Sequence, residues 1–70
     1  MQPAIRSIVD TCVRYGDCRA LDDLMAHRRR LLAALKTLTG TYDTSKPIAQ
    51  MEDEIAVIDA GLAKLNSAAA

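Results

Sequence analysis

Apolar residues recur at helical spacing in three separate segments of the chain. The first segment, over residues 3–15, carries isoleucine, valine and cysteine on one face and polar residues on the other. Gly16 is a stop signal for this helix, because glycine adopts the left-handed conformation at little cost. Asp17 then predicts the N-cap of a second helix over residues 18–39, which Gly40 ends.

A third helix is predicted over residues 46–66, with Thr44 or Ser45 as its cap and Pro47 in its first turn. In the second and third helices the apolar residues alternate spacings of three and four, the pattern of a coiled-coil seam. Residues 67–70 are expected to form a frayed tail. The seam, expected to be core or dimer interface, comprises Leu24, Leu31, Leu35, Leu38, Ile48, Met51, Ile55, Ile58 and Leu62.

These elements predict an all-α fold in a single domain over residues 1–66. The two long helices are similar in length and joined by a short polar loop, which predicts an antiparallel helical hairpin. The apolar face of the second helix is wide enough for two neighbours, and Gly61 lies among alanines where another backbone could approach closely. A homodimer is expected, because so small a chain rarely stabilises itself with few large side chains. The alternative is a monomeric bundle in which the first helix covers the hairpin.

Composition argues against several function classes. Nine basic and nine acidic residues give zero net charge, which weakens any bulk attraction to nucleic acid or an anionic membrane. No apolar run approaches the ~20 residues of a membrane span. Two cysteines and one histidine do not supply the ligands of a metal site, and no nucleophile–base pair or phosphate loop indicates an enzyme or a cofactor. The thiols are expected to stay reduced, in keeping with a cytoplasmic protein.

Charge is divided unevenly along the chain. Residues 1–40 carry seven positive and four negative charges, whereas residues 41–70 carry two positive and five negative. Arg28 lies in the seam, and a turn centred near residue 43 would place it opposite Asp59. We therefore expect Arg28 to pair with Asp59 or with an acid of a partner chain, because unpaired burial of a charge is costly.

Three other positions are candidates for contacts with a partner protein. Arg29 and Arg30 are expected to be solvated, either as an ordinary charged helix face or as an anchor for an acidic partner. Tyr42, in the polar loop, has no core to fill, and tyrosine and arginine are enriched among the residues that dominate interface energetics. Tyr15 is instead expected to pack, with its hydroxyl at the surface.

The predicted function is a non-enzymatic interaction module, a dimeric helical inhibitor or adaptor that binds another protein such as a transcriptional regulator. The alternative is a small nucleic-acid-binding protein that uses the run from Arg28 to Arg30. Against that alternative, acidic Asp22 and Asp23 near the start of the second helix have the wrong sign to approach phosphate.

The stretch from Leu21 to Leu31 resembles the helical chorismate mutases, but the chain lacks the long first helix and the later polar residues of that family's site. In length, in its leucine- and isoleucine-rich hairpin and in its tyrosine-bearing loop, the chain resembles small, early-expressed phage proteins. Some of these are helical dimers that silence a host regulator, such as a quorum-sensing transcription factor or a pilus assembly ATPase. The resemblance implies stoichiometric inhibition by protein–protein contact. Type III secretion chaperones and antitoxins have a similar build.

Overall fold

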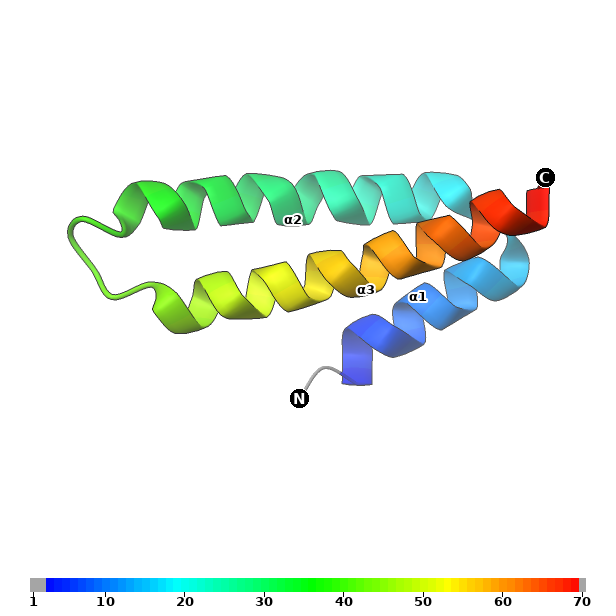
Figure 1. Cartoon of the computed structure of the whole chain (residues 1–70), viewed down its shortest axis with the longest axis horizontal. Helices are drawn as coiled ribbons and strands as arrows, with labels where there is room; N and C mark the ends of the chain where they lie inside the picture. The colour runs from blue at the N-terminus through cyan, green and yellow to red at the C-terminus, as the bar shows by residue number, and fades with distance from the viewer. Residues whose placement is uncertain (1–2, 70) are drawn as a thin grey trace.

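The computed structural model describes residues 3–69, which form three α-helices. Helix α1 spans Pro3–Tyr15, α2 spans Cys18–Leu38 and α3 spans Ser45–Ala69. Figure 1 shows α2 and α3 running antiparallel over their whole length, with α1 alongside one end of the pair. The predicted all-α hairpin with a short preceding helix is confirmed.

The turn between α1 and α2 is built as the sequence predicted. Gly16 has a positive φ of 66°, where a side chain would be strained. Asp17 caps α2, because its side-chain oxygen accepts a hydrogen bond from the Ala20 N–H at 3.1 Å. The two helices therefore reverse direction within two residues, and α1 is brought back against the hairpin.

The ends of α3 differ from the prediction. At the start, Thr44 occupies the predicted N-cap position, since its carbonyl accepts the Ile48 N–H at 2.9 Å. The side-chain contact comes instead from Asp43, whose Oδ1 accepts hydrogen bonds from the Ser45 N–H and hydroxyl. At the other end, residues 67–69 continue the helix instead of forming a frayed tail, whereas residue 70 lies outside the described residues. The helix continues because alanine is the strongest helix former and neither glycine nor proline interrupts it.

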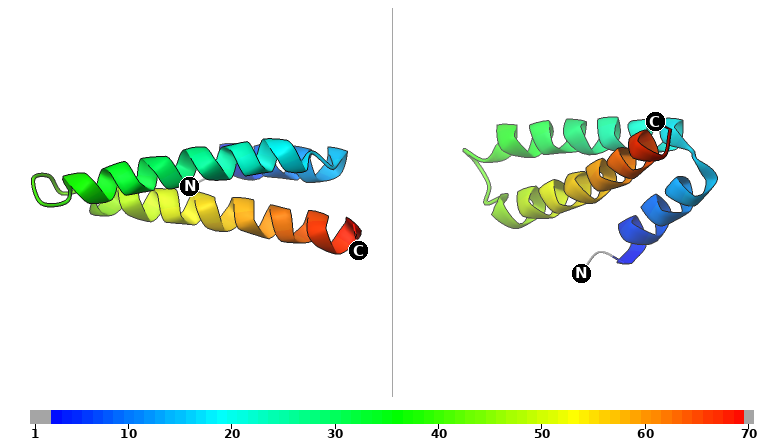
Figure 2. Two further views of the ribbon diagram at one scale, coloured as in Figure 1. Left: turned by 90° about the horizontal axis from the view of Figure 1, so that it is seen from above. Right: turned by 45° about the vertical axis from the view of Figure 1, so that its right-hand side comes forward.

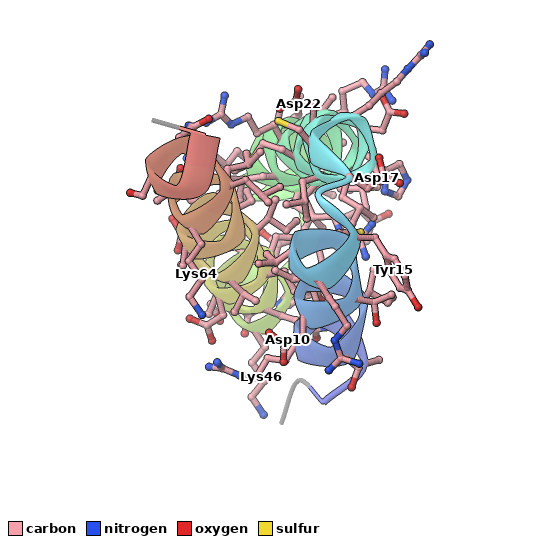
Figure 3. All side chains as sticks on the ribbon, turned by 90° about the vertical axis from the view of Figure 1, so that its right-hand side faces the viewer. Asp10, Tyr15, Asp17, Asp22, Lys46 and Lys64 are labelled. Carbon is pink, nitrogen blue, oxygen red and sulfur yellow. The ribbon has the colours of Figure 1, made fainter. Side chains whose placement is uncertain are left out.

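The buried apolar side chains all lie where the three helices meet. They are Ile5, Val9, Leu21, Met25 and Ile58. Helix α1 packs mainly on α3 and less on α2, as the end-on view in Figure 3 illustrates. The two helices are in close contact at Gly61, where an added Cβ would lie 2.5 Å from a Val9 methyl group. The close backbone approach expected at Gly61 is therefore made by α1 of the same chain.

The short length of α1 divides the molecule into two ends. Its 13 residues extend about 20 Å, so it can accompany α2 at most from the start of that helix to about residue 30. We call this part, with α2 residues 18–30 and α3 residues 52–69, the closed end. The remainder, residues 31–51, is the loop end, where only two helices lie side by side (Figure 2).

Candidate interaction surfaces

Helix α2 carries two adjacent apolar stripes, and α3 covers only one of them. Leu21 and Met25 are buried, and Arg28 and Leu32 continue their stripe along α3 as half-buried residues. The second stripe, turned about 90° round the helix, consists of Leu24, Leu31 and Leu38. Leu24 packs against the core cluster at the closed end. Further along the same stripe, Leu31 and Leu38 remain 39% and 44% exposed.

The predicted seam is therefore not uniform along its length. Ile58 is its fully buried member, and Leu31 and Leu38 are its exposed members. The remaining six are half-buried: Leu24, Leu35, Ile48, Met51, Ile55 and Leu62. Half-burial occurs at both ends, whereas the fully buried seam member lies at the closed end, where α1 adds a third helix.

Arg28 pairs with Glu54 rather than with Asp59. Its Nε lies 3.0 Å from Glu54 Oε1, and the two side chains are 20% and 7% exposed. Asp59 is exposed and lies more than one helical turn further along α3. The expected pairing was wrong because α2 ends and the chain reverses earlier than a turn centred at residue 43 requires.

The Arg28–Glu54 pair belongs to a small polar network at the boundary between the two ends. Gln50 donates a hydrogen bond to the second carboxylate oxygen of Glu54 at 3.2 Å. Arg28 also donates to His27 Nδ1 at 3.0 Å. Within residues 3–69, no buried polar side-chain atom lacks a partner. The network thus compensates the two partly buried charges, as a charge in an apolar seam requires.

The other two arginines remain exposed, as expected, but they do not form one surface with the loop tyrosine. Successive helix positions are about 100° apart, so Arg29 and Arg30 point in different directions. About 14 Å of helix separates Arg29 from Leu38 at the end of α2. Tyr42 lies beyond that end and is 63% exposed.

The prediction that Tyr15 packs against the helices was wrong. Tyr15 is 78% exposed at the end of α1 and points away from the helices, so it does not pack (Figure 3). Sequence reasoning also missed Ile8, which is 45% exposed although it lies on the apolar stripe of α1. The width of that stripe was the available signal, because one helix contact cannot bury all of it.

The loop between α2 and α3 is held by short-range hydrogen bonds. Thr44 is buried, and its hydroxyl donates to the Leu35 carbonyl at 3.3 Å and lies 2.8 Å from the Thr39 hydroxyl. The bonds that Asp43 accepts from the Ser45 hydroxyl and N–H lower the pKa of the Asp43 carboxyl below 3.8, its ordinary value. The loop therefore presents Tyr42 and a charged Asp43 on an ordered backbone.

Within residues 3–69 we also looked for a metal site, a disulfide and a membrane-spanning helix. No group of three or more histidine, cysteine or acidic side chains is placed to hold a metal ion there. Both cysteines are free thiols, with Cys12 half-buried and Cys18 exposed. None of the described helices is long and apolar enough to cross a membrane. The sequence matches no family model, and no curated protein and no solved structure is significantly similar to it.

Proposed function

We propose that this protein is a non-enzymatic interaction module, a dimeric helical inhibitor or adaptor that acts by occupying a surface of another protein. The observation that carries the proposal is the exposure of Leu31, Leu38 and Tyr42 at the loop end. Contiguous apolar surface on a small protein normally marks a contact with a partner. A transcriptional regulator is the class of partner that the resemblance to small phage inhibitors suggests.

The arginine run gives less support to a nucleic-acid-binding role. Arg28 is engaged by Glu54, so its charge is compensated within the chain. Arg29 and Arg30 diverge around the helix, whereas backbone binding of nucleic acid needs several positive charges on one face. The chain as a whole carries no net charge.

Tyr42 is the residue expected to matter most for binding the other protein. It is exposed on an ordered loop, and tyrosine buries a large contact area at low cost in side-chain entropy. The chain offers a matched control in Tyr15, which is also exposed but lies at the opposite end of the molecule.

The experiment is affinity capture from a bacterial lysate with three baits: the unchanged chain, Tyr42→Ala and Tyr15→Ala. We expect a protein retained by the first and third baits and lost from the second. With that protein purified, calorimetric titration should show binding weakened at least tenfold by Tyr42→Ala. Capture that is indifferent to Tyr42→Ala would remove the loop from the interaction surface.

A further inference from the structure

A groove at the closed end lies between α1 and α3, and the proposed function makes no use of it. Its volume is about 130 Å³, similar to the roughly 150 Å³ of a cavity that accommodates benzene. The groove is bordered by Arg6 and Asp10 of α1 and by Lys64 of α3, among other residues. It therefore has the size of a small molecule and is separate from the exposed leucines of the loop end.

The inner wall of the groove is aliphatic. Val9 is buried there, and Val13 and Val57 are half-buried. Gly61 also lines the wall and adds no side chain. A polar group that entered this part would lose its hydrogen bonds to water without a side-chain partner to replace them. The part of a ligand that reaches this wall must therefore be a small apolar group.

The rim of the groove carries charges of both signs. Arg6 and Asp10 are four residues apart and so lie on one face of α1, whereas Lys64 comes from α3 (Figure 3). All three side chains are exposed, and none of them forms an ion pair within the described residues 3–69. One anion and two cations thus border a single small space without direct contact between them.

We propose that this groove binds a small aliphatic α-amino acid such as valine. The side chain of the ligand packs on the valines of the wall, its ammonium group meets Asp10, and its carboxylate meets Arg6 and Lys64. A simple carboxylate would be repelled by Asp10, and a simple amine by the two cations. A zwitterion matches both signs of charge at once, and its two charged groups are on the carbon that also carries the apolar side chain.

A ligand in this groove contacts both α1 and α3, and it therefore stabilises the packing of one helix on the other. The stabilisation grows as the ligand concentration rises above the dissociation constant, because the ligand binds only the folded arrangement. The surface with Leu31, Leu38 and Tyr42 takes no part in this site. The inference therefore goes beyond the proposed function and does not rest on it.

The first test is an NMR titration of the purified full chain with L-valine. We expect the amide signals of Val9 and Gly61 to shift saturably, with a dissociation constant on the order of 1 mM for so small a ligand. The Tyr42 signal should not move. The melting temperature should rise by about 5 °C at a valine concentration about ten times that constant. The absence of a saturable shift, or shifts of equal size at the two ends of the molecule, would overturn the proposal.

Two analogues of valine test whether both charges of the ligand are needed. N-acetylvaline lacks the ammonium group and resembles the carboxyl end of a peptide, whereas valinamide lacks the carboxylate and resembles the amino end. Each should bind about fivefold more weakly than valine, because one exposed charge contact is lost. If either analogue binds as well as valine, the groove takes the end of a peptide chain and not a free amino acid, and the proposal is wrong.

Charge-neutral variants of the chain test the location of the site. Asp10→Asn and Lys64→Gln should each weaken valine binding about fivefold, because each removes one exposed charge partner of the ligand. Asp53→Asn and Lys46→Gln make the same changes at exposed positions of α3 outside the groove, and they should leave binding unaltered. Circular dichroism checks that all four variants are folded. Valine binding that survives both groove variants, or equal effects of groove and control variants, would reject the site.

Discussion

The closed end and the loop end of this hairpin are made from the same kind of sequence but reach different degrees of burial. Both contain leucine and isoleucine at spacings of three and four. At the closed end Leu21 and Ile58 are completely inaccessible to solvent, whereas at the loop end no apolar side chain is buried. The difference is one short helix, α1, which covers only the closed end. Two helices with an apolar seam therefore leave part of that seam exposed, and a third element decides which part becomes core.

The comparison also separates stability from binding within one small molecule. Burial at the closed end supplies most of the hydrophobic stabilisation, because that term scales with the apolar area removed from water. The loop end contributes less to folding, and its exposed leucines and Tyr42 are free to contact other molecules. The two ends should therefore respond differently to equivalent substitutions.

The largest expected effect is at the closed end. Leu21→Ala removes a side chain with no solvent exposure and should lower the free energy of unfolding by about 3 kcal/mol. The equivalent change at the loop end, Leu32→Ala, removes a half-buried side chain and should cost about 1 kcal/mol. Urea denaturation at one protein concentration measures both.

If Leu21→Ala leaves too little folded protein to measure, Ile58→Val is the milder closed-end variant, with an expected cost of about 1 kcal/mol. Equal losses from Leu21→Ala and Leu32→Ala would show that the two ends share one core, and the comparison would then be wrong.

An intermediate effect is expected at the boundary, where Arg28 meets Glu54. Arg28→Met leaves the Glu54 carboxylate with Gln50 as its remaining partner and should cost about 2 kcal/mol. The double variant Arg28→Met, Glu54→Leu should recover most of this loss, because both charges are then absent. Thermal denaturation of the two single variants and the double variant gives the coupling energy. A coupling energy near zero would mean that the interaction between Arg28 and Glu54 contributes nothing to the stability of the fold.

Local signals explain why the helix boundaries were largely predictable. Gly16 and Asp17 each fulfil the role that their chemistry suggests, the first with a positive φ and the second as a cap. The prediction of a frayed tail was wrong because alanines extend a helix unless a glycine or proline ends it. The predicted pairing of Arg28 with Asp59 was also wrong. A pairing across a hairpin depends on the position of the turn, and a shift of about two residues there moves the contact by a full helical turn.

The division into two ends could not be derived from the seam itself. A repeat of leucine and isoleucine looks the same at Leu24 and at Leu38, because the pattern records which face is apolar and not what covers it. The exposed partner-binding candidates, Arg29, Arg30 and Tyr42, were placed correctly at the surface, but their separation depends on the three-dimensional path of the chain. Gly61 was the residue that signalled a close helix contact, although not which helix would make it.

The smallest effect is expected at Gly61, and its sign is informative. In an isolated helix, Gly61→Ala would stabilise by about 1 kcal/mol through helix propensity. Here the added Cβ would lie 2.5 Å from the Val9 methyl group, so the stiff, β-branched Val9 side chain, or α1 with it, must shift away from α3. We expect a net loss of about 1 kcal/mol in denaturation, since overpacking outweighs propensity. Hydrogen exchange should show the lost protection concentrated in the α1 amides.

Two further variants separate the steric term from the propensity term. Ala60→Gly, at the exposed position before Gly61, reports the propensity change alone and should destabilise by about 1 kcal/mol without selective exposure of α1. Adding Val9→Ala to Gly61→Ala removes the clashing methyl group and should restore protection to α1 relative to Gly61→Ala. If Gly61→Ala instead stabilises the chain and leaves α1 protected, then α1 does not need this close approach. In that outcome α1 would cover the closed end without a tight contact at residue 61.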